Sequence, residues 1–139
     1  MTSAKNTIMM TERVMMKLTE FLIEIAKPLL TPVLFPTISF LLLAVLAFVT
    51  GSNWGMSAVV IPILLPLCDA LGANVVLTMA AIISGGAFGS HACFYTDATV
   101  LASNSAGIDN MEHALTQIPY VTIAAVLSTI GFGVAGVLI

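Results

Sequence analysis

Apolar positions along the chain form three long stretches. Residues 28–68, 70–96 and 113–139 contain no Asp, Glu, Lys or Arg. A helix needs about 20 apolar residues to cross the hydrocarbon core of a bilayer, and each stretch is longer than this. The stretches also lack the strict polar and apolar alternation of membrane β-strands. The pattern therefore predicts an all-α integral membrane protein with several transmembrane helices.

The N-terminal segment has a different pattern. Charged residues recur at steps of three or four within residues 8–27, with apolar residues between them. These charged residues are Arg13, Lys17, Glu20, Glu24 and Lys27. The spacing predicts an amphipathic helix within residues 1–28, which lies along the membrane surface or packs against another segment. A membrane domain is predicted over residues 29–139.

A polar interruption at residues 51–55 divides the first apolar stretch. The segment after it, Met56–Cys68, contains two prolines and reaches only about 20 Å as a helix, which is too short to span a bilayer. We therefore expect Pro28–Thr50 and this segment to form a re-entrant hairpin with residues 51–55 at its tip, lined by protein or water. A surface loop between two shortened spans is the alternative.

A second polar interruption follows the helix predicted from Val75. Glycine and hydroxyl residues accumulate over residues 85–97, which would begin about 15 Å into the membrane if the helix enters near Asn74. We expect the glycines to loosen the helix there. A half-helix would then begin at Thr96 or Asp97 and end at Gly107. The sequence thus predicts a discontinuous helix near the middle of the membrane.

The C-terminal stretch predicts one more membrane span. A polar connection over residues 109–117 leads to Pro119, which suits a first helical turn, and then to an apolar helix over residues 120–139. Small residues, among them Gly131 and Gly136, give this helix a face for close packing.

Composition and charge exclude several classes of protein. The chain is 59% hydrophobic and 8% charged, with a net charge of −3. No Lys or Arg follows Lys27, so there is no basic surface for nucleic acid. The early cluster of basic residues predicts a cytoplasmic N-terminus, in the cytoplasmic (inner) membrane. The chain has neither a nucleophile elbow nor a zinc-ligand pattern, so we expect no enzyme and no cofactor. Cys68 and Cys93 are interpreted as free thiols.

Asp97 is the principal candidate for function, because a carboxylate deep in a bilayer costs about 2.5–3.5 kcal/mol. Oxygen-bearing neighbours could join it in holding a small hard cation such as Na⁺. These neighbours are Thr96, Thr99, Ser103 and Asn104. The alternative is that Asp97 only caps a half-helix at the membrane interface.

The first polar interruption offers a second set of oxygen ligands. Ser52 and Asn53 supply a hydroxyl and an amide oxygen beside Gly51, which permits an unwound backbone. Broken helices of this kind form ion sites in secondary transporters, although ordinary turn chemistry is an alternative. His91 is a candidate proton relay because histidine titrates near neutral pH, or else a hydrogen-bonded packing residue.

Several of these motifs, in this order, resemble the C-terminal part of the NhaC family of Na⁺/H⁺ antiporters, from about Leu29 to the end. They are Thr50-Gly-Ser-Asn-Trp-Gly55, Ile83-Ser-Gly-Gly-Ala-Phe-Gly-Ser-His91, Thr96-Asp-Ala-Thr99, and Asp109 through His113 to Thr116-Gln-Ile-Pro-Tyr120. The chain departs from the family pattern at Ser90, where the family has an acidic residue. It also departs at Cys93-Phe94-Tyr95, where the family has a Ser-Pro pair.

The resemblance implies half of an inverted-repeat transporter that exchanges Na⁺ for H⁺. It implies that five residues line the ion path, namely Gly51, Ser52, Asn53, Asp97 and Thr99. The partner would be the N-terminal half of the transporter or a second copy of the chain, within the lipid bilayer. Transport of organic anions or amino acids, as in some relatives, is one alternative. A membrane subunit or fragment that transports nothing is another.

Overall fold

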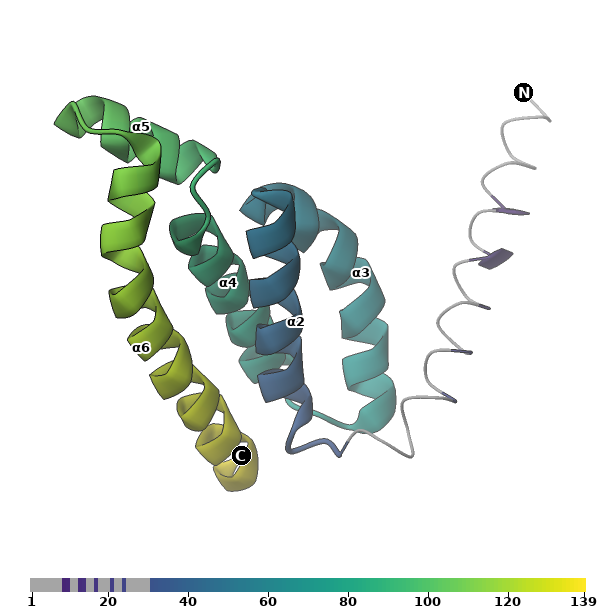
Figure 1. Ribbon diagram of the computed structural model, residues 1–139. Helices are drawn as coiled ribbons and strands as arrows, with labels where there is room; N and C mark the ends of the chain where they lie inside the picture. The colour runs from purple at the N-terminus through teal and green to yellow at the C-terminus, as the bar shows by residue number, and fades with distance from the viewer. Residues whose placement is uncertain (1–8, 11–12, 15–16, 18–20, 22–23, 25–30) are drawn as a thin grey trace.

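The chain is a bundle of helices that lie side by side (Figure 1). The computed structural model describes residues 31–139, together with residues 9, 10, 13, 14, 17, 21 and 24. The amphipathic helix predicted within residues 1–28 otherwise lies outside the described residues. The helices of the described part are α2 (Phe35–Thr50), α3 (Asn53–Leu71), α4 (Val75–Ala92), α5 (Asp97–Ala106) and α6 (Asn110–Leu138).

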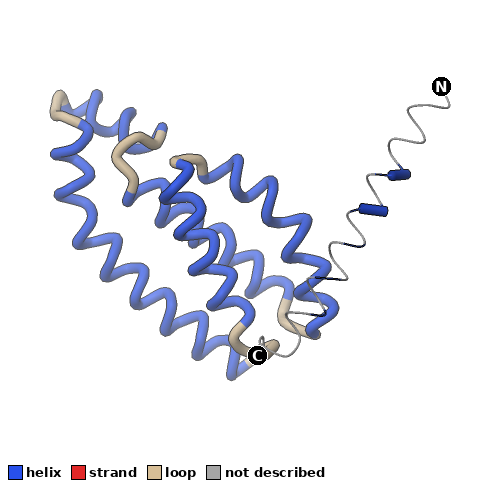
Figure 2. Tube along the Cα trace, turned by 45° about the vertical axis from the view of Figure 1, so that its right-hand side comes forward, coloured by secondary structure: helices blue, strands red, loops and turns tan. Residues whose placement is uncertain are grey.

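Three of these helices have the length and apolar composition to cross a membrane. They are α3, α4 and α6, and α2 is a shorter apolar helix of 16 residues. The loops lie at the two ends of the bundle, while α5 runs across one end (Figure 2). The prediction of an all-α membrane protein is confirmed.

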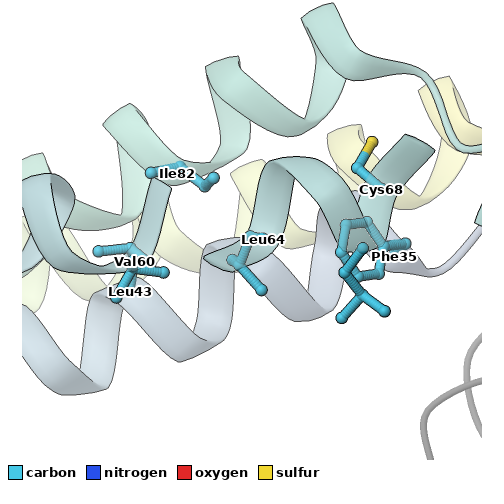
Figure 3. Packing of buried hydrophobic residues seen from close by; sticks show 7 residues of the cluster. Phe35, Leu43, Val60, Leu64, Cys68 and Ile82 are labelled. Carbon is cyan, nitrogen blue, oxygen red and sulfur yellow. The ribbon is translucent and has the colours of Figure 1, made fainter. Parts of the chain in front are cut away.

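The apolar core lies where α2, α3 and α4 meet. Phe35 and Leu43 come from α2, Val60 and Leu64 from α3, and Ile82 from α4 (Figure 3). Leu43 and Ile82 are fully buried. Because interiors of this kind are close-packed, these contacts fix how the three helices sit against one another.

Glycines on α4 make its contact with α2 unusually close. A Cβ on Gly89 would lie 2.5 Å from the Phe48 backbone nitrogen, and one on Gly85 would lie 3.1 Å from that of Ala44. The prediction that these glycines loosen the helix is wrong, because α4 stays helical through Gly85, Gly86 and Gly89 as far as Ala92. Their missing side chains instead let α4 approach the backbone of α2.

The helix break therefore lies only in the last part of the predicted range of residues 85–97. It is confined to residues 93–96 and follows the whole of α4, whose 18 residues extend about 27 Å. Asp97 is thus at the end of a helix of spanning length rather than half-way along it. The half-helix itself is as predicted, with Thr96 as its N-cap and Gly107 in the left-handed conformation as its C-cap.

Two further helices are longer than predicted. The segment after the first interruption was expected to be too short to span, but α3 continues from Asn53 to Leu71 with Pro62 and Pro66 inside it, about 28 Å in all. The polar connection before the last span is also helical. It forms the first turns of α6, because the Asp109 side chain caps the helix by accepting from the Met111 N–H at 2.9 Å.

Candidate functional site

The two helix breaks meet at one end of the bundle (Figure 1). One is the link between α2 and α3 at residues 51–52, and the other is the link between α4 and α5 at residues 93–96. Tyr95 joins them: its ring lies against Gly51, and its hydroxyl donates to the backbone carbonyls of Phe48 and Val49.

Gly51, Ser52 and Asn53 shape the first break. Gly51 has a φ of 68°, a left-handed conformation that favours glycine. The Ser52 hydroxyl accepts from the Gly55 N–H at 3.2 Å and so caps α3. The Asn53 amide lies against Gly86 of α4, where a Cβ would be 3.0 Å from its Cγ. The first break thus reaches α4 through the side chain of Asn53.

Thr96 and Thr99 hold the second break together. The Thr96 hydroxyl donates to the Ser90 carbonyl at 2.6 Å, and the Thr99 hydroxyl donates to the Cys93 carbonyl at 2.8 Å. Both threonines are buried. These hydroxyls therefore satisfy carbonyls that the end of α4 leaves without helical partners, and they fix the direction in which α5 departs.

The two sides of α5 separate the predicted cation ligands. Thr99 and Ser103, one turn apart, are buried, and the Ser103 hydroxyl donates to the Asn110 amide oxygen. Asp97 and Asn104, seven residues apart, lie together on the exposed side. At 100° per residue these pairs occupy different faces. The structure therefore brings Thr96 and Thr99 together, but it does not place Asp97 and Ser103 on one face.

Asp97 lies at the first position of α5. One carboxylate oxygen accepts from the Ala98 N–H at 2.9 Å, and the positive end of the α5 dipole favours its charge. No Lys or Arg follows Lys27 in the sequence, so neither residue type can pair with it among residues 28–139. Its exposed oxygens remain open to a mobile cation.

His91 belongs to a different part of the structure. It is exposed and lines a pocket of about 260 Å³ between α4 and α6, together with Ser84 and Ser128. A neighbouring pocket of about 240 Å³ shares the same two serines. Sequence reasoning missed Ser84 and Ser128 as a pair, although each is a polar residue within an apolar helix. It also missed Tyr95, whose contacts with α2 span more than 40 residues of sequence.

The helix ends give this part of the molecule its electrostatic character. Helices α2 and α4 end there, while α3 and α5 begin there. Carbonyl ends and N–H ends, with their opposite partial charges, thus lie close together. Backbone carbonyls, hydroxyls and one carboxylate are oxygen ligands of the kind that hard cations prefer. Discontinuous helices also form ion sites in secondary transporters, where the breaks lie near the middle of the membrane; here the breaks lie at one end of the bundle.

Comparisons with known proteins place the chain in a family. The chain matches the model of the Na⁺/H⁺ antiporter family over residues 10–137. It is 32% identical over 82 residues to an uncharacterized Na⁺/H⁺ antiporter of Haemophilus influenzae, covering 59% of this chain and 17% of that protein. It is 29% identical over 110 residues to a malate-2H⁺/Na⁺-lactate antiporter of Bacillus subtilis, and the match covers 76% of this chain and 24% of that protein.

Another relative is an arginine/ornithine antiporter of Halobacterium salinarum, 31% identical over 109 residues, covering 78% of this chain and 22% of that protein. The chain thus spans about a quarter or less of the length of the relatives it matches. No solved structure matches it significantly. The match of the family model to most of the chain confirms the family that the sequence motifs indicated, and the chain belongs to the Na⁺/H⁺ antiporter family.

Proposed function

We propose that the chain carries the C-terminal part of a Na⁺/H⁺ exchange site, with Asp97 as the group that binds the two ions in turn. Protonation of the carboxylate removes the negative charge that attracts Na⁺, and bound Na⁺ disfavours protonation. The two ions therefore exclude each other at one side chain. Alternate exposure of that side chain to the two sides of the membrane turns this competition into exchange.

One observation carries the proposal. Asp97 is a carboxylate with no Lys or Arg partner among residues 28–139, and it begins α5 directly after a helix break. That break contacts a second one through Tyr95. The carboxylate is exposed at that end of the bundle, where it can meet both Na⁺ and H⁺.

The exposed surface supports a membrane setting with a further polypeptide. Large apolar side chains are exposed along α6, including Ile123, Leu127, Ile130, Val134 and Leu138. Such a surface exceeds what a soluble monomer displays. We propose that lipid of the cytoplasmic membrane covers part of it, with the N-terminus on the cytoplasmic side. The rest would contact the other half of a transporter or a second copy of this chain.

The relatives favour a second candidate substrate class. One is named as an antiporter of malate and lactate, and another as an antiporter of arginine and ornithine. The same site could therefore couple a cation to an organic anion or an amino acid. Distinguishing these substrates needs a flux measurement for each.

The test is to express the chain in everted membrane vesicles, confirm insertion by alkaline extraction, and add Na⁺ or Li⁺ to a respiration-generated pH gradient. We expect Na⁺ to collapse the gradient, and Asp97→Asn to abolish the effect without loss of insertion. The matched control is Asp69→Asn, at the other end of α3. Collapse that persists in Asp97→Asn contradicts the assignment. Collapse only with malate, lactate or a basic amino acid supports the second class. Insertion without any flux indicates a subunit that transports nothing by itself.

A further inference from the structure

The end of α2 has two backbone carbonyls that its own helix does not use. The Gly51 N–H is bonded to the Ala47 carbonyl at 2.9 Å, which closes the helix. The next N–H, that of Ser52, turns to the Thr50 hydroxyl instead. The carbonyls of Phe48 and Val49 therefore lack helical partners, as at any helix end, and they lie at the negative end of the α2 dipole.

The Tyr95 hydroxyl occupies both of these carbonyls. It is 3.3 Å from the Phe48 carbonyl oxygen and closer still to that of Val49. A hydroxyl has one hydrogen to donate, whereas two carbonyls offer four lone pairs. Acceptor capacity is therefore left over at a point where negative partial charge accumulates. Carbonyls at such helix ends are the usual ligands of Na⁺ in transporters with broken helices.

The position of Tyr95 requires the glycine beneath it. A Cβ on Gly51 would lie 2.6 Å from the Tyr95 Cδ2. The ring also makes an edge contact with Phe94, at 5.0 Å between centroids. Yet 49% of Tyr95 remains exposed, so the ring can swing away without opening a cavity in the core. The contact therefore depends on a specific geometry, but breaking it needs little free energy.

We propose that Tyr95 is a gate of the cation site: its hydroxyl holds the Phe48 and Val49 carbonyls until a cation takes its place. This inference rests on the proposed function, because it assigns those two carbonyls to the same site as Asp97. Cation binding and the Tyr95 hydrogen bonds then exclude each other.

The first test is the Na⁺ dependence of pH-gradient collapse in everted vesicles that contain the full 139-residue chain. Tyr95→Phe keeps the ring and removes the competing hydroxyl. We expect it to lower the KM for Na⁺ by about 3- to 10-fold, the factor that one net hydrogen bond supplies, without raising the maximum rate. Tyr120→Phe, on the exposed surface of α6, is the matched control and should leave the KM unchanged. An unchanged or higher KM in Tyr95→Phe overturns the gate while the antiport assignment stands.

A spectroscopic test follows the ring directly. The chain has two tyrosines, so Tyr120→Phe protein grown with 3-fluorotyrosine carries a fluorine at Tyr95 alone. We expect Na⁺, but not choline, to shift its ¹⁹F resonance, and Asp97→Asn to abolish the shift. Gly51→Ala should displace the resonance without any ion. A resonance that does not shift when Na⁺ is added overturns the gate. If Na⁺ still collapses the pH gradient, only the gate is contradicted. If Na⁺ does not collapse the gradient, the proposed function is contradicted as well.

Discussion

Gly89 offers the sharpest test of how α4 packs against α2. In Gly89→Ala the new Cβ would lie 2.5 Å from the Phe48 backbone nitrogen and 2.7 Å from the Ala47 carbonyl carbon. Ordinary van der Waals contact begins near 3.4 Å. The helices must therefore separate by roughly 1 Å at this point, and neither obstructing atom belongs to a flexible side chain. Overpacking of this kind lowers the free energy of unfolding by about 1–3 kcal/mol.

The chain contains its own reporter for this measurement. Cys68 and Cys93 are free and buried, so a thiol-reactive fluorophore reacts with them as the protein unfolds. We expect Gly89→Ala to lower the midpoint of thermal unfolding in detergent by several degrees. Gly131→Ala is the matched control, because no atom lies within 4 Å of its new Cβ. Its midpoint should stay the same or rise, since alanine favours helix. Equal midpoints for the two variants would refute the close contact between α2 and α4.

The remaining predictions concern the second break and the core. Thr96→Val removes the N-cap of α5 and the bond to the end of α4. We expect the free energy that holds α5 against α4 to fall by about 1–2 kcal/mol. The thiol-reactive fluorophore should then label Cys93 faster at temperatures below global unfolding. An unchanged labelling rate would contradict the role of Thr96. Ile82→Ala should lower the free energy of unfolding by about 2–5 kcal/mol, because Ile82 is fully buried. Ile83→Ala, whose side chain is 57% exposed, should cost far less in the same thermal assay, and equal losses would contradict the core assignment.

Local signals in the sequence predicted both ends of α5. The bounds of α5 follow from Thr96 and Gly107, because a side-chain N-cap and a left-handed glycine act through the nearest turn alone. The start of α4 at Val75 also agrees with the helix predicted from that residue, and the Asn74 side chain caps it by accepting from the Leu77 N–H. Such ends are encoded within a few residues, so one sequence is enough to find them.

Features that depend on distant contacts were not predictable. Glycines weaken an isolated helix, but Gly85 and Gly89 face α2, and that packing keeps α4 regular. The prolines of α3 suggested a short segment, yet a helix buried in a bundle or bilayer tolerates them. Both errors came from local propensity where tertiary packing decides the outcome.

The candidate site was predictable only in part. Helical geometry alone separates Asp97 from Thr99 and Ser103, so the split between the two faces of α5 could have been found from the sequence. The contacts that each face makes could not have been found from the sequence. The bond from Tyr95 to the end of α2 joins residues 46 positions apart, and no periodicity in one sequence indicates such a contact.

The central claim is that Na⁺ and H⁺ compete for the Asp97 carboxylate. The most direct measurement is proton release from the purified chain in a weakly buffered membrane mimetic at fixed pH as Na⁺ is added. When the pH is low enough for the carboxylate to be protonated before Na⁺ is added, the account predicts saturable proton release from the wild-type chain, and no release from Asp97→Asn. Release of equal size from Asp97→Asn would contradict it, and so would Na⁺ binding to the wild-type chain at that pH without any proton release.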